Sequence, residues 1–463
     1  MRLPLNQRGL CGIGMLTLLF SVIGVMQAVC AQEAGPAREK VVEAMQRGTK
    51  FFREQVASHG GYAYYASGDL KRRWGEGEVA VDTVVVQPPG TPTVGMAYLK
   101  AYAATNDAYF LEGAREAGKA LVEGQLQSGG WTQVIHFGKP PSGDLGKYRK
   151  RAGGNKNNSS LDDDQTQAAL RFLMRLDEAE GFKNEEVHEA VLYGLDSLLK
   201  AQFPCGAFPQ VWQEPVKTHP VKAAKYPEYD WKTEGRVKDY WNYYTLNDNL
   251  AGTVFETLRV AEEVYKEARF RDAIVRLGDF LILAQMPEPQ PAWCQQYSYE
   301  MVPIWARKFE PPAITAWESQ DVMRTLIRIA EHTGDKKYLA PISKGLNFLE
   351  KHVLSDGKVA RYYELRTSKP LYMDGEYQLT YDDSQAPSHY GWKQGNKLSE
   401  IRKAWEAAMR GEEKKEPVTK KVSRKGVELA LQSQDKEGRW VSTFAGESLV
   451  GKPKARKGSR VHF

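Results

Sequence analysis

Three copies of one short motif decide the fold of this chain: QLQSGGW at residues 125–131, QFPCGAF at 202–208 and QDKEGRW at 434–440. Each copy begins with Gln and ends with Gly, one further residue and an aromatic ring. Weaker echoes occur at Gly60-Gly61-Tyr62 and around Trp293. The copies and echoes return every roughly 65–85 residues, about the length of two helices and two loops. This period predicts helical hairpins arranged around a ring.

The segments between the motif copies have the periodicity of helices. Their apolar residues recur at spacings of three and four, which places them on one helix face. They are Ala169, Phe172, Leu173 and Leu176 in one segment, Leu195, Leu198 and Leu199 in the next, and Leu250, Val254, Leu258 and Ala261 in a third. Alternating, strand-like patterns are scarce. We therefore predict an all-α toroid of helical (α/α) hairpins, whose long loops form a substrate groove.

The composition is that of an ordinary globular protein with a surplus of aromatic rings. Of the 463 residues, 42% are hydrophobic and 26% are charged, and the chain contains 11 Trp and 23 Tyr. Aromatic rings fill cores, and they also serve as flat platforms for sugars. Both uses stay open at this stage.

The first 31 residues have the features of a signal peptide. Arg2 and Arg8 precede an apolar run over residues 10–26, and Val29 and Ala31 occupy the two recognised positions for cleavage after Ala31. A membrane anchor is the alternative, although the apolar run is short for a bilayer span. We expect a secreted or periplasmic protein without stable membrane association after cleavage.

The mature chain is weakly basic and poor in cysteine. Removal of residues 1–31 takes away two Arg and no acids, so the net charge falls from +6 to +4. A weak positive charge is compatible with a polyanionic substrate, and it is equally compatible with the absence of any charged partner. We expect no nucleic-acid partner and a monomer. Only Cys205 and Cys294 follow the leader, so a disulfide framework is excluded, and whether these two pair stays open.

Composition sets the expected boundaries beyond the leader. We assign residues 32–410 to a catalytic toroid and the charged stretch 411–425, GEEKKEPVTKKVSRK, to a linker. Residues 426–463 are expected to form a C-terminal helix and a basic tail.

A basic loop, KYRKR at residues 147–151, precedes the first acidic cluster. A solvated charged loop is the simpler interpretation, and binding of a polyanion is the alternative.

The first acidic cluster, SSLDDD at residues 159–164, comes directly before a predicted helix. Ser160 suits an N-cap, and acids in a first helical turn interact favourably with the helix dipole. Three adjacent carboxylates also repel one another, so a bound cation is the competing interpretation.

The second cluster, TLNDN at residues 245–249, also opens an amphipathic helix. Asn247 as an N-cap is the structural alternative. If both helix starts lie at one end of a ring, Asp162 and Asp248 converge there. A hard cation takes carboxylate and water oxygens in such a place.

A polar stretch that proline makes stiff lies between residues 293 and 319. Pro303, Pro311 and Pro312 exclude a continuous helix, so its polar groups are expected on a rigid loop. Stiff loops that carry Arg, Glu and Gln are typical of functional sites. A surface ion pair between Arg307 and a nearby Glu is the structural alternative.

This stretch carries a resemblance to a known family. WCQQY at 293–297, ARKFEPP at 306–312 and Glu318-Ser319 resemble the signature of family 10 polysaccharide lyases, the pectate lyases. Further motifs of that family follow the same order: GWTQ at 130–133, LDDD at 161–164 with Thr166, NDN at 247–249 and RYYE at 361–364. The resemblance extends over roughly residues 60–390 and depends on five spaced motifs.

The resemblance implies β-elimination of α-1,4-polygalacturonate with calcium as cofactor. It assigns Arg307 as the base that removes the C-5 proton, and Asp162 and Asp248 as calcium ligands. It also implies the following substrate-binding residues: Asp163, Arg361, Glu310 and Gln295. A guanidinium with a pKa above about 12 is a base only at high pH or beside positive charge.

The chain departs from the family pattern at two places. Asp163 stands where the family usually has Asn, and Asp374-Gly375 stand where a second arginine usually follows Arg361. The missing arginine leaves a non-catalytic, polyuronate-binding toroid as one alternative function.

A terpene-cyclase-like toroid is the other alternative, because such proteins also combine Gln-rich repeats ending in Gly-x-Trp with an acidic run. The leader, the polar loop at Arg307 and the lack of an apolar helix suited to membrane docking argue against it.

Overall fold

The computed structural model describes residues 36–140, 143–388, 390–412, 423–441, 443–444 and 461–462. The predicted signal peptide, most of the predicted linker and most of the basic tail lie outside these residues. The chain divides into two compact units. One contains helices α2 (Pro36–Phe51) and α12 (Arg424–Ser433), which pack on each other. The other contains the elements from β1 to α11 together with β16 and β17, and it carries the candidate site.

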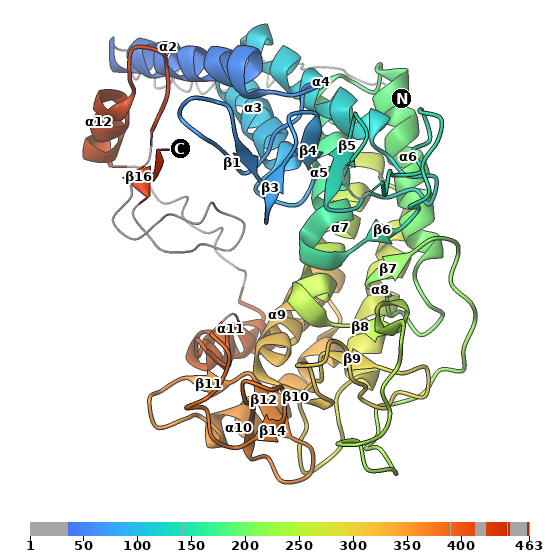
Figure 1. The fold of residues 1–463 in the computed structure, drawn as a ribbon. Coiled ribbons are helices and arrows are strands. Elements are labelled where there is room, and N and C mark those ends of the chain that lie inside the picture. The colour runs from blue at the N-terminus through green and yellow to red at the C-terminus, as the bar shows by residue number, and fades with distance from the viewer. Residues whose placement is uncertain are drawn as a thin grey trace, which may run out of the picture. The chain divides into compact units, whose positions relative to one another are not determined.

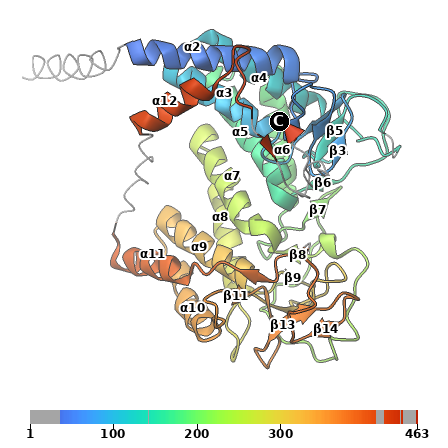
Figure 2. The same cartoon turned by 60° about the vertical axis from the view of Figure 1, so that its left-hand side comes forward.

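The second unit consists of consecutive helical hairpins (Figure 1). Its α-helices are α3 (Thr91–Thr105), α4 (Ala108–Glu123), α5 (Gln165–Ala179), α6 (Glu185–Lys200), α7 (Leu250–Tyr265), α8 (Ala268–Leu283), α9 (Ala316–Thr333), α10 (Ile342–Lys351) and α11 (Leu398–Arg410). The first helices pack in succession, α3 on α5, α5 on α7, α7 on α9 and α9 on α11 (Figure 2). The returning helices α4, α6, α8 and α10 each pack against this layer. The predicted all-α fold of toroid-type helical hairpins is confirmed.

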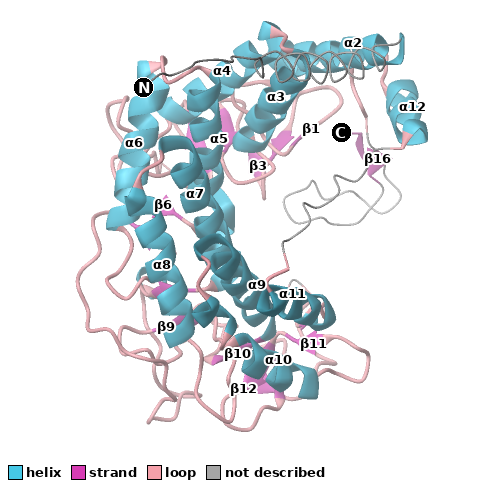
Figure 3. Cartoon of the chain, turned by 180° about the vertical axis from the view of Figure 1, so that it is seen from behind, coloured by secondary structure: helices cyan, strands magenta, loops and turns pink. Residues whose placement is uncertain are grey.

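Short strands recur at the starts of the first helices, and Figure 3 distinguishes them from the helices by colour. Antiparallel pairs form between β4 (Thr83–Val85) and β5 (Val134–His136), β6 (Ser159–Ser160) and β7 (Val211–Trp212), β8 (Tyr244–Thr245) and β9 (Gln296–Tyr297), and β10 (Ala313–Thr315) and β12 (Tyr362–Glu364). In each pair one strand precedes the first helix of a hairpin and its partner follows that hairpin. The pairing therefore gathers the helix starts and the loops after the hairpins at one end of the unit.

The remaining strands extend this pattern locally. A three-stranded sheet contains β1 (Tyr65–Ala66), β2 (Arg73–Trp74) and β3 (Glu78–Val79). Strands β13 (Pro370–Met373) and β14 (Leu379–Thr380) continue the sheet of β10 and β12. The other pairs join β11 (Val359–Ala360) to β15 (Lys393–Gln394) and β16 (Thr443–Phe444) to β17 (Val461–His462).

The glutamine that opens each motif copy explains why the motif repeats. Gln125 Nε2 donates to Gly129 O within its own turn and to Ala190 O in α6, both at 2.8 Å. Gln202 makes the same pair of bonds, to Gly206 O and to Ala273 O in α8. Each glutamine thus closes its own turn and ties it to the returning helix of the next hairpin.

Two further glutamines repeat this arrangement. Gln285, eight residues before Trp293, donates to Pro291 O and Pro341 O. In the other unit, Gln434 donates to Gly438 O and to Ala44 O in α2. The sequence repeat is therefore a structural repeat, including the weak echo at Trp293.

The core is built around rings from the same motifs. Trp131 and Trp293 are fully buried, and their indole N–H groups donate to Leu121 O and Leu281 O, each at 2.8 Å.

Cys205 and Cys294 are both buried and free. Within the described part of the chain, no helix has the length and apolar character needed to cross a membrane.

The basic loop at residues 147–151 is anchored to the protein. Arg149 contacts Gln125 and Glu189, and Lys150 pairs with Glu186 at 3.1 Å. Arg151 donates to His136 O at 3.0 Å. These contacts support the structural interpretation of this loop.

Candidate active site

Two turns with the same backbone conformation begin helices α5 and α7. They are the 3₁₀ turns η2 (Asp162–Asp164) and η4 (Asn247–Asn249). In η2, Asp163 and Asp164 have φ of 44° and 64°, and in η4, Asp248 and Asn249 have φ of 50° and 56°. Two successive left-handed residues are unusual outside glycine, and Asp and Asn tolerate this conformation best. The two turns are thus structural repeats in which Asp163 corresponds to Asp248.

This geometry corrects the expected helix caps. Neither Ser160 nor Asn247 is the N-cap of its helix, because Asp164 and Asn249 occupy those positions without a capping side-chain bond. Ser160 Oγ instead accepts a hydrogen bond from the backbone N–H of Asp162 at 3.1 Å. The left-handed residues separate the predicted caps from the first helical residues, so the polar side chains of both turns are available for another role.

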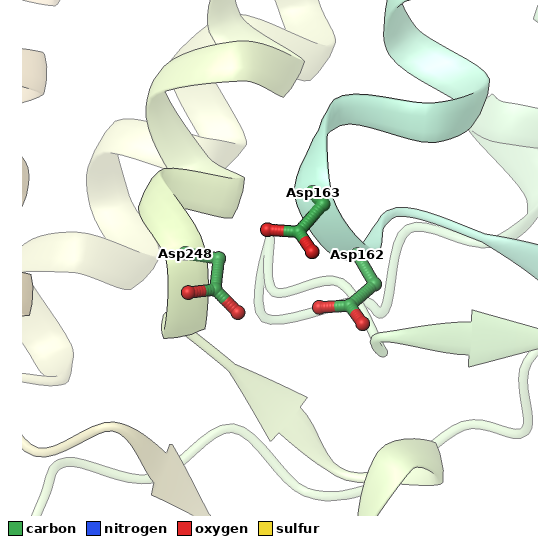
Figure 4. A group of neighbouring side chains, drawn as sticks. All are labelled: Asp162, Asp163 and Asp248. Carbon is green, nitrogen blue, oxygen red and sulfur yellow. The ribbon is translucent and has the colours of Figure 1, made fainter. Parts of the chain in front are cut away.

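Three carboxylates from these turns converge. Asp162, Asp163 and Asp248 each offer an oxygen, and these oxygens lie within 4.8 Å of one another. Figure 4 shows Asp162 and Asp163 at the start of α5, facing Asp248 at the start of α7. The predicted convergence of Asp162 and Asp248 is present, and Asp163 joins them.

The proximity of these carboxylates changes their titration. Burial, followed by the charges of Asp162 and Asp163, raises the pKa of Asp248 to about 8. Burial and the charge of Asp162 raise the pKa of Asp163 to about 6. Burial also raises the pKa of Asp162. The charged forms of all three are therefore disfavoured in the metal-free protein.

The residues present fit a hard divalent cation. The donors are carboxylate oxygens from two helix starts, the ligand type that Ca²⁺ prefers. In addition, Asn247 Oδ1 is buried and has no hydrogen-bond partner among the described residues. A bound cation would offset the burial of these carboxylates and the repulsion among them, which raise the pKa values of Asp163 and Asp248.

Asp164, the third acid of the first cluster, has a different environment. Its Oδ2 pairs with the guanidinium of Arg171 on α5. Arg171 also donates to Thr257 Oγ1 on α7 at 2.9 Å. Asp164 therefore stabilises the packing of the two helix starts.

Gln87 links Asp163 to a loop that sequence reasoning did not single out. Its Nε2 donates to Asp163 Oδ2 at 3.1 Å and to Glu76 Oε1 at 2.9 Å. The carboxylates of Glu76 and Asp163 also contribute, after burial, to raising the pKa of Tyr64. The loop after β2 thus approaches the acidic group from the Asp163 side.

The two halves of the proline-rich stretch meet. One small cavity is lined by residues of both: Cys294, Gln295, Gln296, Ile304, Ala306, Glu310, Pro311, Pro312 and Ala313. Arg307 lies on this loop and forms an ion pair with Glu310, the contact that the structural alternative anticipated. Glu310 is buried, however, so this is not a surface pair.

The ion pair with Glu310 controls the charge of Arg307. Arg307 Nε lies 2.9 Å from Glu310 Oε2, and Nη2 lies 2.6 Å from Oε1. This hydrogen-bonded pair raises the pKa of Arg307 above its usual value. The positive charge of Arg307 lowers the pKa values of Asp162 and Asp163, although the opposing effect of burial is larger. Arg307 therefore faces the acidic group as a guanidinium.

Gln295 and Glu310, both predicted to bind substrate, are buried and bonded to tyrosines. Gln295 Oε1 accepts from Tyr362 Oη at 3.3 Å, and Glu310 Oε1 accepts from Tyr390 Oη at 2.8 Å. Their contact with substrate stays a prediction.

Arg361 lies beside a buried acid. Its Nη2 is 3.9 Å from Glu318 Oε1, and the Glu318 side chain is fully buried in the first turn of α9. Arg361 Nε is buried and has no hydrogen-bond partner in the described ranges. Burial raises the pKa of Glu318, and the Glu318 charge in turn contributes to the raised pKa of Asp248. Arg361 and Glu318 therefore belong electrostatically to the same site as Asp248.

Sequence reasoning placed Asp163 apart from the metal ligands and gave no role to Tyr390. A signal for Asp163 exists in the sequence, because SLDDD at 160–164 and TLNDN at 245–249 align position by position. Each has a hydroxyl residue, then Leu, then Asp or Asn, then Asp, then Asp or Asn, so the alignment pairs Asp163 with Asp248. No comparable pattern identifies Tyr390, which approaches the site only through tertiary folding.

The fold and site together define a class: a helical-hairpin enzyme with an oxygen-rich acidic group beside an arginine on a proline-rich loop. Residues 139–333 match the family model of pectic acid lyases, a segment that includes Asp162, Asp248 and Arg307. Over this segment the chain is therefore similar to pectic acid lyases. The resemblance to pectate lyases and the predicted enzyme class are confirmed.

Comparisons with other proteins gave fold matches alone. A comparison with curated protein sequences returned no match. A mutant of the family 10 polysaccharide lyase from Cellvibrio cellulosa, in complex with trigalacturonic acid, matches with a TM-score of 0.49 and 18% identity, over 68% of this chain and 98% of that chain. The family 10 polysaccharide lyase from the same organism matches with a TM-score of 0.47 and 18% identity, over 69% and 97%. A D-mannose isomerase matches with a TM-score of 0.43 and 13% identity, over 80% and 97%.

Proposed function

We propose that this protein is a calcium-dependent pectate lyase that cleaves α-1,4-polygalacturonate by β-elimination. One observation carries the proposal. The segment that matches the pectic acid lyase family places the Asp162, Asp163 and Asp248 carboxylates within 4.8 Å of one another, with Arg307 electrostatically coupled to them.

Asp162, Asp163 and Asp248 would hold the calcium ion. When bound, calcium supplies positive charge that neutralises a uronate carboxylate and makes the neighbouring C-5 proton more acidic. The proposed role of Arg361 is to pair with a substrate carboxylate, since guanidinium groups bind carboxylates through paired hydrogen bonds.

Arg307 is the proposed base for the C-5 proton. To act as a base it must first lose a proton, and the ion pair with Glu310 opposes that loss. Separation from Glu310 and proximity to other positive charge both favour the neutral guanidine. The proposal therefore includes a reaction rate that increases toward alkaline pH.

The proposal is tested by ultraviolet absorbance on polygalacturonate, first with calcium and then with a chelator. Elimination creates a conjugated double bond that absorbs, whereas hydrolysis does not. We expect absorbance to rise with calcium and to stop rising when the chelator is added. Release of reducing ends without absorbance would identify a hydrolase and contradict the proposal.

The absorbance assay together with a binding measurement distinguishes the proposed lyase from a non-catalytic polyuronate binder. Binding of polygalacturonate measured by affinity electrophoresis, with neither absorbance nor chain shortening, would favour the binder. No specific observation favours a terpene-cyclase-like function.

We also propose secretion to the periplasm or the medium and a monomeric state. The support for secretion is the charged, apolar and small-residue pattern of residues 1–31. Detection of mature protein beginning after Ala31 in the medium or periplasm tests it, and a mature chain that retains the leader contradicts it.

A further inference from the structure

Tyr390 contacts both arginines that the proposed function requires. It lies beyond the segment matched by the family model and is half-buried. The guanidinium carbon of Arg361 lies 4.0 Å from the centre of its ring, and that of Arg307 lies 5.8 Å away. One side chain therefore adjoins two cations that come from separate loops.

The hydroxyl of Tyr390 acts on Arg307 through Glu310. Tyr390 Oη donates to Glu310 Oε1 at 2.8 Å, and the same oxygen of Glu310 accepts from Arg307 Nη2 at 2.6 Å. Glu310 is 2% exposed, so the carboxylate that accepts both bonds is shielded from water. A buried carboxylate with two fixed donors has one orientation, and its orientation sets that of the guanidinium.

A second tyrosine fixes Tyr390 in turn. Tyr362 Oη lies 3.2 Å from Tyr390 Oη and 3.3 Å from Gln295 Oε1. Because Tyr390 gives its own hydrogen to Glu310, its oxygen accepts from Tyr362, whose single hydroxyl hydrogen is then shared between Tyr390 Oη and Gln295 Oε1. Hydrogen bonds thus connect Gln295 to Arg307 through Tyr362, Tyr390 and Glu310. Tyr362 is fully buried, so this series of hydrogen bonds is fixed at its inner end.

The ring of Tyr390 acts on Arg361 directly. A guanidinium stacked on an aromatic face is attracted by the ring, and the attraction is stronger away from water. The other neighbours of the Arg361 side chain are Tyr362, which hydrogen-bonds to it, and Glu318 at 3.9 Å, while Arg361 Nε is buried without a partner in the described residues. Phe309 and Trp392 pack edge-on against the Tyr390 ring, at 4.9 and 5.4 Å between ring centres. The ring is therefore a fixed support for Arg361.

We propose that Tyr390 is the positioning residue that sets the spacing of Arg307 and Arg361, its hydroxyl acting through Glu310 and its ring acting on Arg361. The two contacts have separable consequences for the proposed lyase reaction, on which this inference rests. Loss of the hydroxyl misplaces Arg307 and lowers kcat. Loss of the ring also releases Arg361 and weakens substrate binding.

The test compares Tyr390→Phe, which keeps the ring, with Tyr390→Leu, which removes it. Tyr381→Phe is the matched control, because Tyr381 also donates to a glutamate, Glu364 Oε1 at 2.7 Å. For Tyr390→Phe we expect kcat to fall about tenfold to a hundredfold with KM within twofold of wild type, as for a small misplacement of a reacting group. For Tyr390→Leu we expect the same loss in kcat and a severalfold higher KM. Tyr381→Phe should keep the wild-type values.

A double mutant tests the route through Glu310. If the hydroxyl acts through Glu310, then Tyr390→Phe adds no further loss in the Glu310→Gln background. Independent, multiplying losses would overturn this route, and so would a Tyr390→Phe variant with wild-type kcat, KM and rate–pH profile. Thermal unfolding of each variant, matched to Tyr381→Phe, separates these effects from a folding defect.

Crystal structures of wild type and Tyr390→Phe decide the inference without reference to activity. We expect the Arg307 guanidinium to shift relative to Arg361 when the hydroxyl is absent. Unchanged positions of both guanidinium groups would overturn the inference. Absence of unsaturated product from the wild-type enzyme would instead overturn the proposed function, and the two structures would still decide on Tyr390.

Discussion

Arg307 and Glu310 form a bidentate ion pair whose carboxylate end is fixed and whose guanidinium end is accessible. The Glu310 side chain is 2% exposed and the Arg307 side chain is 47% exposed. Besides the two guanidinium contacts, the backbone N–H of Arg307 donates to Glu310 Oε2 at 3.0 Å. Glu310 therefore orients the proposed base and also keeps it protonated.

The first prediction concerns Glu310→Gln. The carboxylate of Glu310 is the main cause of the raised pKa of Arg307, so its loss lowers that pKa. If Arg307 is the base, a larger neutral fraction is then present at each pH, and the rising limb of the rate–pH profile moves to lower pH. The maximal rate should fall about tenfold or more, because the guanidine loses its fixed orientation. A rising limb at the wild-type position would show that Arg307 is not the titrating base.

The second prediction concerns the stability of the metal-free protein. The folded pKa values of Asp163, about 6, and Asp248, about 8, lie above the value of about 4 for an unfolded Asp. The folded state therefore holds protons that the unfolded chain has released between pH of about 4 and 8. Its free energy of unfolding decreases as pH rises through this window.

Urea denaturation with chelator at several pH values measures this decrease. Calcium should restore the lost stability at the alkaline end, since it binds the folded state. Asp248→Asn should flatten the pH dependence and abolish the calcium effect, whereas the exposed Asp272→Asn should leave both unchanged. A stability that rises with pH in chelator would contradict the raised pKa values.

The third prediction distinguishes the first acidic cluster's members. Asp162→Asn removes a carboxylate from the acidic group, so we expect loss of calcium binding and of most activity. Asp164→Asn removes the partner of Arg171 and should cost about 1 kcal/mol of stability with calcium affinity within a few-fold of wild type. Calorimetric titration of calcium into both variants measures the difference. Equal losses of affinity would place Asp164 among the ligands.

The hairpin repeat could be predicted because it depends on local signals. Gln125 and Gln202 recur with their turns since each bonds its own turn before it bonds the next hairpin. The equivalent positions of Asp163 and Asp248 in the structure result from left-handed backbone angles at the two helix starts. A helix cap at Ser160 does not imply such angles.

Other parts of the site depend on tertiary contacts. Tyr390 and Glu310 are 80 positions apart in sequence, and the pairings of β10 with β12 and of β11 with β15 bring them together. The burial of Glu318 likewise follows from the packing of α9 against α7. No periodicity or motif spacing contains this information.

The fourth prediction tests the repeat glutamines. Gln202→Leu leaves Gly206 O and Ala273 O, both in buried residues, without their side-chain donor, and it removes the acceptor of Arg276. Loss of these side-chain hydrogen bonds in a buried turn should lower the free energy of unfolding by roughly 2–4 kcal/mol. Gln127→Leu, at an exposed position of a motif copy, is the control and should change it by less than about 0.5 kcal/mol. Similar losses in both would show that the repeat bonds contribute little.

The fifth prediction concerns Arg307 itself. Arg307→Ala removes the proposed base and should abolish turnover, while binding of oligogalacturonate through Arg361 and calcium should persist. Arg307→Lys keeps a charge but loses the fork that matches both oxygens of Glu310, so most activity should be lost through misplacement.

The decisive comparison is a rate–pH profile of the absorbance assay for wild type, Arg307→Ala and Arg307→Lys, with oligogalacturonate binding measured in parallel. For the wild type, the high pKa of Arg307 predicts a rate that climbs past neutral pH until another group or the fold fails. Lys has a lower intrinsic pKa, so any residual activity of Arg307→Lys should reach its plateau at lower pH than the wild type. If Arg307→Ala keeps a tenth or more of the wild-type rate at alkaline pH, another group removes the proton, and Arg307 then serves to bind the developing negative charge as a guanidinium.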